Sequence, residues 1–161
     1  MKTLFAIVAV TGLALAQEPG ERKMPAGFKE IARLAGTWEG EDGAKVTYRL
    51  VSAGSVVLET LVHGKAGEMV TVYHGDGEDL VMTHYCSLGN QPHMKAGPGP
   101  KAGSIRFACA GGTNLKCATD LHMHALTLTF VDADHLTQEW TMVQGGQEKH
   151  TATFHLVRKK E

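Results

Sequence analysis

Two pairs of chemically reactive residues stand two positions apart in segments with the composition of β-strands. The pairs are His84 with Cys86 and His122 with His124. Residues two apart on a strand point to the same face of a sheet. Imidazole and thiol groups placed side by side can bind a soft metal ion or orient the polar groups of a ligand. These four residues are therefore the first candidates for a functional site.

Large apolar residues share the predicted face of each pair. Alternation places Leu80 and Met82 on the side of His84. It also places Leu126, Leu128 and Phe130 on the side of the two later histidines. That face should be interior, where polar groups cost free energy unless they are hydrogen-bonded. Two interpretations stay open: a ligand site and a satisfied network in the core.

The first sixteen residues have the pattern of a secretory signal peptide. A basic start at Lys2 precedes an almost wholly apolar run over 3–15, and the small-x-small triplet 14–16 forms a cleavage site before Gln17. The run is too short for a membrane span, and no later run has membrane length. We therefore expect an exported chain, periplasmic or secreted, that begins at Gln17 and has no transmembrane span.

The length and composition favour one domain that does not bind nucleic acid. The chain has 161 residues and a formal charge of −1, which becomes −2 once Lys2 is removed with the leader. Basic residues are scattered and form no stripe, so nucleic acid is not an expected partner. We expect a flexible leader over 17–27 and one folded domain over 28–161. The composition does not determine an oligomeric state.

The spacing of apolar residues changes from helical to strand-like near Gly36. Phe28, Ile31 and Leu34 recur every three residues, which predicts one short helix. Further along, alternating segments bounded by turn residues predict strands. We expect loops over 89–103 and 111–120. The pattern predicts an all-β fold, a single antiparallel up-and-down β-barrel of about eight to ten strands with a short N-terminal helix. The expected strands are 46–50, 55–62, 68–74, 79–86, 104–109, 122–131, 135–143 and 150–158.

The triplet Gly36-Thr37-Trp38, placed after a short helix and before a meander, resembles the calycin superfamily of lipocalins and fatty-acid-binding proteins. In that superfamily the tryptophan plugs one end of the barrel, and a basic residue of the last strand packs over its indole. Arg158 has the matching place here. The resemblance implies a closed barrel with a cation–π contact of about 1 kcal/mol between Arg158 and Trp38.

Two finer resemblances lie within this superfamily. The run from Thr83 to Pro92, with the later 111–114, looks like an uncharacterised group of exported bacterial calycin-like proteins, whose likeness implies a fold and no activity. The run from Gly36 to Gly40 is also similar to nitrobindin-like haem barrels, which use a histidine near the C-terminus as haem ligand. His155 has that position, but alternation turns it away from the predicted interior.

The predicted interior has the character of a small-molecule pocket, mostly apolar with a few polar groups. Small closed barrels hold about one small ligand. We therefore expect a lipocalin-like protein that binds a small, partly apolar molecule inside the barrel. The expected ligand-binding residues are His84, Cys86, His122, His124, Trp140, Phe107, Met82, Glu59 and Tyr73.

The alternative is a metal- or haem-binding barrel with redox or isomerase activity. Its metal ligands would be His84, Cys86, His122 and His124, a set that suits zinc or copper. No Cys-x-x-Cys or His-Glu-x-x-His motif supports a zinc site, and no Gly-x-Ser-x-Gly motif supports a hydrolase. We therefore expect a binding protein without catalytic residues or a resident cofactor.

The cysteines Cys86, Cys109 and Cys117 offer one disulfide in an oxidising compartment. Cys109 and Cys117 flank a loop that contains two glycines, which makes them one possible pair. Cys86 with Cys109 is the rival pair, since both should face inward. The sequence leaves the two pairings open.

Overall fold

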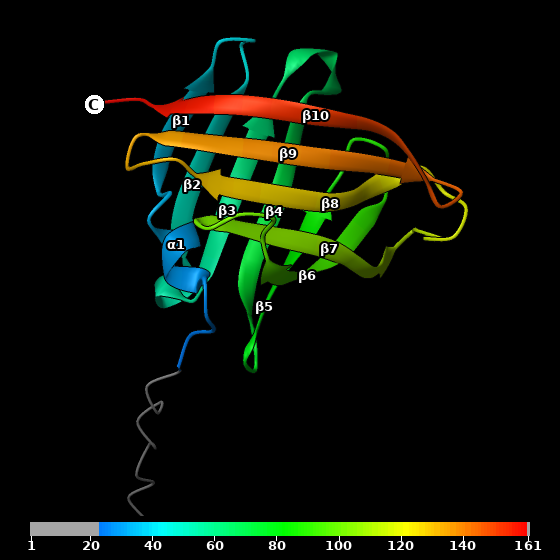
Figure 1. Cartoon of the computed structure of the whole chain (residues 1–161), viewed down its shortest axis with the longest axis horizontal. Coiled ribbons are helices and arrows are strands. Elements are labelled where there is room, and N and C mark those ends of the chain that lie inside the picture. The colour runs from blue at the N-terminus through cyan, green and yellow to red at the C-terminus, as the bar shows by residue number, and fades with distance from the viewer. Residues whose placement is uncertain (1–22, 161) are drawn as a thin grey trace, which may run out of the picture.

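The alternating segments after Gly36 fold into a closed barrel of ten antiparallel strands, preceded by one short helix (Figure 1). The computed structural model describes residues 23–160. Each strand pairs with its neighbours in sequence, and β1 pairs with β10 to close the barrel. The predicted fold class is confirmed, and the architecture is consistent with a calycin-like fold. The elements are α1 (Phe28–Ala32), β1 (Gly36–Gly40), β2 (Lys45–Val51), β3 (Val56–Val62), β4 (Glu68–Asp76), β5 (Asp79–Tyr85), β6 (Gln91–Pro98), β7 (Ser104–Thr113), β8 (His122–Phe130), β9 (His135–Gln144) and β10 (Gln147–Arg158).

The predicted loop over 89–103 is wrong for its first half, because β6 lies there. The two prolines of β6, Pro92 and Pro98, lack the N–H group that a central strand needs. Strand β6 pairs with β5 only from His93 to Lys95, whereas it pairs with β7 along its whole length. Pro92 and Pro98 therefore fall outside the part of the strand that is paired on both sides. The predicted loop at 111–120 also begins later, since β7 continues to Thr113.

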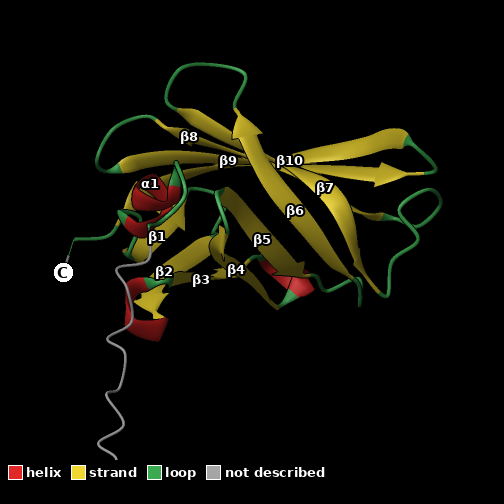
Figure 2. Ribbon diagram, turned by 90° about the horizontal axis from the view of Figure 1, so that it is seen from below, coloured by secondary structure: helices red, strands yellow, loops and turns green. Residues whose placement is uncertain are grey.

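One end of the barrel is closed by Trp38 and Arg158, which are direct partners in the β1–β10 ladder. The buried indole donates a hydrogen bond from Nε1 to the carbonyl of Leu34 at 2.8 Å. The guanidinium carbon lies 4.2 Å from the centroid of the indole ring, and the guanidinium also donates to the carbonyls of Ala35 and Arg33 at 2.8 and 2.9 Å. Helix α1 and the last strand are thus joined across this end, where Figure 2 shows α1 beside β1.

The packing of Arg158 over Trp38 also requires a glycine at position 36, at the start of β1. Its φ of +129° lies in the region that glycine adopts without strain. A Cβ atom built there would lie 3.1 Å from Nη1 of Arg158. A side chain at this position would therefore press on the guanidinium that covers Trp38.

The period-two alternation correctly predicts the interior face of β3, β4 and β5. On β5, Leu80, Met82 and His84 are buried, as is Cys86 directly after the strand. In Figure 2, strands β2 to β5 and β8 to β10 lie on opposite sides of the barrel. Their inward side chains meet in one core.

Among the described residues, no helix is long and apolar enough to cross a membrane.

Register shifts interrupt the alternation near the ends of β7, β8 and β10. Relative to β9, the register of β8 shifts between Met123 and Ala125. A bulge adds one residue to one strand and so changes which face the following residues take. Simple alternation from Leu126 and Leu128 therefore does not determine which face His122 and His124 take, because the bulge lies between them. A second shift lies between β6 and β7, where His93 pairs with Gly111 and Met94 with Cys109, so that β7 has one extra residue.

Candidate functional sites

A row of four polar residues crosses strands β2 to β5 inside the barrel. Tyr48 is the ladder partner of Glu59, Glu59 is the partner of Thr71, and Thr71 is the partner of His84. All four are almost completely buried, with at most 2% of any residue exposed. Directly opposed side chains on neighbouring strands have Cβ atoms about 5 Å apart, so the row is continuous.

Hydrogen bonds join this row to strand β9 on the other side of the barrel. Gln138 donates from Nε2 to the hydroxyl of Tyr48, and Trp140 donates from Nε1 to Oε1 of Gln138 at 3.0 Å. The ring of Trp140 packs against the ring of His84 with centroids 4.5 Å apart. We call this group the lumenal polar cluster. Its members are Tyr48, Glu59, Thr71, Tyr73, His84, Gln138 and Trp140.

Two atoms of the lumenal polar cluster have no hydrogen-bond partner within residues 23–160. Oε2 of Glu59 accepts from the hydroxyl of Tyr73 at 2.6 Å, but Oε1 of Glu59 has no partner. Nδ1 of His84 lies 3.0 Å from the hydroxyl of Thr71, but Nε2 of His84 has no partner. Leaving such a buried polar atom unsatisfied costs about 1–3 kcal/mol, which a bound polar group would relieve.

Burial sets the charge of the cluster near neutrality. Burial raises the pKa of Glu59 to about 7, against the opposing effects of the neighbouring Tyr73, Tyr48 and Gln138 side chains. Burial lowers the pKa of His84 to about 4, so its imidazole is neutral at pH 7. Burial and the nearby Glu59 carboxyl raise the pKa of Tyr48 and Tyr73 well above the usual range, so both phenols stay protonated. The cluster therefore carries at most one negative charge.

Either form of His84 is compatible with its contacts. If the Thr71 hydroxyl donates to Nδ1, then Nε2 carries the proton and is a donor; if Nδ1 donates to Thr71, then Nε2 is an acceptor. Glu59, with a pKa near 7, is likewise able to donate or accept at Oε1. The two unsatisfied atoms can therefore serve a ligand group with both functions, such as a hydroxyl or an amide.

The structure brings together six of the nine predicted ligand-binding residues. Glu59, Tyr73, His84 and Trp140 belong to the lumenal polar cluster, and two apolar candidates adjoin it. The ring of Phe107 packs edge-on against Tyr73 with centroids 5.5 Å apart, and Met82 is the ladder partner of Tyr73. Cluster members not among the predicted set are Tyr48, Thr71 and Gln138. Their alternation with apolar neighbours is the signal that could have identified them.

Three of the predicted ligand-binding residues, Cys86, His122 and His124, lie away from the lumenal polar cluster. Cys86 begins the turn after β5, where its carbonyl accepts from the amide of Gly89, and burial raises the pKa of its thiol. His122 and His124 belong to a different group of side chains, described next. His155, the positional match to a haem-binding histidine, is exposed on β10.

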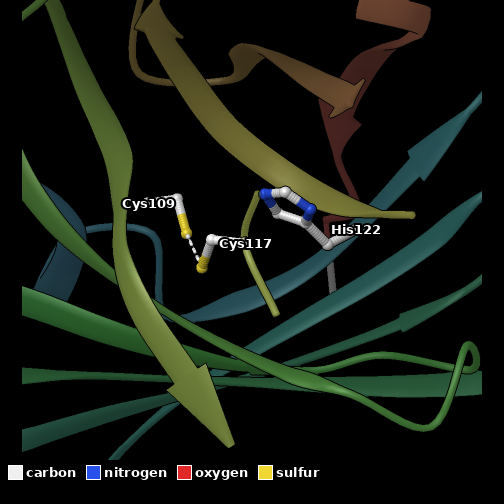
Figure 3. Close-up of side chains that lie close together, drawn as sticks. All are labelled: Cys109, Cys117 and His122. Atoms are coloured by element: carbon white, nitrogen blue, oxygen red, sulfur yellow. Dashed lines mark hydrogen bonds between the residues drawn. The ribbon is translucent and has the colours of Figure 1, made fainter. Parts of the chain in front are cut away.

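The second cluster consists of Cys109, Cys117 and His122 (Figure 3). Cys109 lies on β7, Cys117 on the loop after it, and His122 at the start of β8. One ligand atom from each lies within 4.8 Å of the other two. Figure 3 shows the two sulfur atoms directed toward each other and the imidazole beside them. We call this group the thiol–imidazole cluster.

The imidazole of His122 is held in one orientation. Its Nδ1 lies 2.8 Å from the carbonyl oxygen of Asp120, so Nδ1 must carry the proton and donate. Its Nε2 is then an acceptor, and it lies 3.1 Å from Nδ1 of His124. His122 is fully buried, whereas His124 is partly exposed. Burial lowers the pKa of His124, with smaller effects of the same sign from His122 and Arg106.

The sulfur atoms of Cys109 and Cys117 lie 3.5 Å apart, and both cysteines are in the thiol form. Within the part of the chain that the structure describes, this is the pair of cysteines whose sulfurs are in contact. Burial raises the pKa of the Cys109 thiol, which also donates to the carbonyl of Gly111 at 3.4 Å. The metal ligands predicted from the sequence, by contrast, do not come together: His84 lies in the lumenal polar cluster, and Cys86 lies in the turn after β5. Only His122 belongs to the thiol–imidazole cluster, with His124 in contact with it.

A scan against models of protein families found no match. A search of curated proteins also found no match.

Proposed function

We propose that this chain is an exported, calycin-like binding protein that takes one small, partly apolar molecule inside its barrel. The proposal rests on one observation: Glu59 Oε1 and His84 Nε2 are both buried in the lumenal polar cluster without a partner in the described residues. Proteins rarely leave buried polar atoms unsatisfied, and a bound ligand would satisfy them. The leader sequence supports export, and the closed barrel supports the calycin-like assignment.

The chemistry of the cluster indicates the class of ligand. A neutral His84 and a Glu59 with a pKa near 7 favour an uncharged molecule that has a hydroxyl or amide group. Met82, Phe107 and Trp140 would supply apolar contact area, which gives the ligand an apolar part. Large side chains fill much of the interior, so the ligand should be small.

The first experiment is a search for bound ligand and for binding. Native mass spectrometry of the purified exported protein should show a retained small molecule. Small alcohols, amides and aromatic compounds should be screened by tryptophan fluorescence, because Trp140 lies in the cluster. A panel that leaves the fluorescence unchanged, together with a protein free of retained ligand, would contradict the proposal.

Two variants connect binding to the cluster. Glu59→Gln and His84→Gln should each weaken binding of a hit about tenfold, which corresponds to the loss of one buried hydrogen bond. His155→Gln is the matched control, because His155 is an exposed histidine on β10. Equal affinity in all three variants would place the binding site elsewhere.

A further inference from the structure

The thiol–imidazole cluster has a composition that the proposed ligand does not explain. It contains two thiols and an imidazole within 4.8 Å, and a second imidazole contacts the first. These side chains come from β7, from the loop that follows it and from β8, so the fold rather than local sequence assembles them. Sulfur and imidazole ligands together are typical of sites for soft or borderline metal ions and unsuited to magnesium or calcium.

We propose that Cys109, Cys117 and His122 bind a single zinc ion, with His124 as the fourth ligand. This site is separate from the lumenal polar cluster, and the inference does not depend on the proposed ligand of the barrel.

The spacing of the ligand atoms agrees with a tetrahedral zinc site. Zinc–sulfur bonds of about 2.3 Å place two sulfurs about 3.8 Å apart around a tetrahedral ion, and zinc–nitrogen bonds of about 2.0 Å place two nitrogens about 3.3 Å apart. The two sulfurs are 3.5 Å apart, and the two histidine nitrogens are 3.1 Å apart. Within each pair an ion therefore requires only a few tenths of an ångström of widening. The ligand atoms of Cys109, Cys117 and His122 already lie within 4.8 Å of one another, whereas His124 contacts only His122 and would have to move toward the sulfurs to complete the set.

The surroundings orient the ligands before any ion binds. The carbonyl of Asp120 holds Nδ1 of His122, which leaves Nε2 to bind the metal; such a second hydrogen bond is usual for zinc-bound histidines. The loop that carries Cys117 is also tied to itself. The side chain of Asp120 accepts from the amide of Lys116 at 2.8 Å, and the amide of Asp120 donates to the carbonyl of Lys116 at 2.9 Å. Cys117 lies within this closed loop.

A disulfide between Cys109 and Cys117 would use the same two sulfur atoms. Its S–S bond of about 2.05 Å requires the sulfurs to approach further, and it makes no use of the imidazoles. The two states exclude each other, so zinc binds the reduced form only. The imidazole of His122 beside the sulfurs, with a second imidazole in contact with it, is the observation that favours a metal site over a plain disulfide.

The test uses the mature chain, reduced with a phosphine and kept free of oxygen. Cobalt(II) serves as a spectroscopic substitute for zinc and should bind one equivalent. It should produce near-ultraviolet sulfur-to-cobalt charge-transfer absorption of a two-thiolate site, and zinc should displace it. Cys117→Ser and His122→Gln should each weaken zinc binding at least 100-fold. Cys86→Ser is the matched control, a buried cysteine outside the cluster, and should bind zinc as the parent does.

Alkylation provides a second measurement that does not depend on the folding of any variant. Zinc should slow the modification of Cys109 and Cys117 by iodoacetamide at least tenfold, while Cys86 serves as the internal reference. Absence of charge-transfer absorption, binding that survives Cys117→Ser, or unprotected thiols would each overturn the proposed site. His124→Gln should weaken zinc binding about tenfold or more; unchanged affinity would overturn the assignment of His124 as a ligand.

Discussion

Glu59 and His84 should give opposite dependences of stability on pH, although they lie in one row of the barrel. The pKa of Glu59 is raised from 4.5 to about 7 in the folded protein. Between these values the unfolded chain releases its proton and the folded protein retains it, so the contribution of Glu59 is fully present below pH 4.5 and is lost as the pH rises through 7. A difference of this size corresponds to about 3 kcal/mol in the free energy of unfolding.

His84 acts in the opposite direction over nearly the same range. Its pKa is lowered from 6.5 to about 4 in the folded protein. The unfolded chain gains a proton below pH 6.5 while the folded protein does not, so the contribution of His84 is lost as the pH falls from 6.5 toward 4. The magnitude is again about 3 kcal/mol. In the parent protein the two contributions should therefore largely cancel between pH 4.5 and 6.5.

Single variants should remove this cancellation. Glu59→Gln should lose stability as the pH falls from 6.5 to 4.5, because only the contribution of His84 remains. His84→Gln should lose stability as the pH rises from 4.5 to 7, because only the contribution of Glu59 remains. Both retain a polar group able to contact Tyr73 or Thr71, which limits other changes.

Urea unfolding followed by circular dichroism at pH 4.5, 5.5, 6.5 and 7.5 measures these changes. The quantity of interest is the free energy of unfolding of each variant minus that of the parent, which cancels the effect of the other titrating groups. His155→Gln, at an exposed position, is the control for replacing a histidine outside the cluster. If the difference for Glu59→Gln varied by less than about 0.5 kcal/mol across this range, the reasoning would be refuted. Removing a buried carboxyl whose pKa is raised must change how the free energy of unfolding depends on pH.

Four further outcomes follow from the structure. Trp38→Ala should cost about 3–5 kcal/mol, as a large deletion in the core, and an unchanged melting temperature would contradict its role as a plug. Arg158→Met should cost about 1–3 kcal/mol in urea unfolding, because it removes the cation–π contact and the hydrogen bonds to the carbonyls of Arg33 and Ala35, between α1 and β1; no loss would show these contacts to be unimportant. Mass spectrometry of the exported chain should find Gln17 as its first residue, whereas a retained leader would refute cleavage. In the absence of metal, oxidised glutathione should join Cys109 to Cys117, and peptide mapping that finds another pairing would contradict the observed proximity of their sulfurs.

Period-two alternation determined much of the barrel interior from the sequence alone. It placed Glu59, Tyr73, Met82 and His84 inward, because successive side chains on any strand take opposite faces whatever the strand pairs with. The turn residues between the alternating segments also predicted the meander. Strand β6 was missed because its two prolines are typical of loops, and only its short pairing with β5 makes them tolerable.

The grouping of these residues into sites was decided by the tertiary structure. Closure of the barrel brings Gln138 to Tyr48, 90 positions away in the sequence. Bulges and a long loop bring His122 to Cys109 and Cys117 and away from His84. Which face a residue takes is a local property of the strand. Which residues meet depends on strand pairing, on the register shifts that bulges introduce, and on the closure of the barrel between distant segments. The spacing of neighbouring residues in the sequence encodes none of these three.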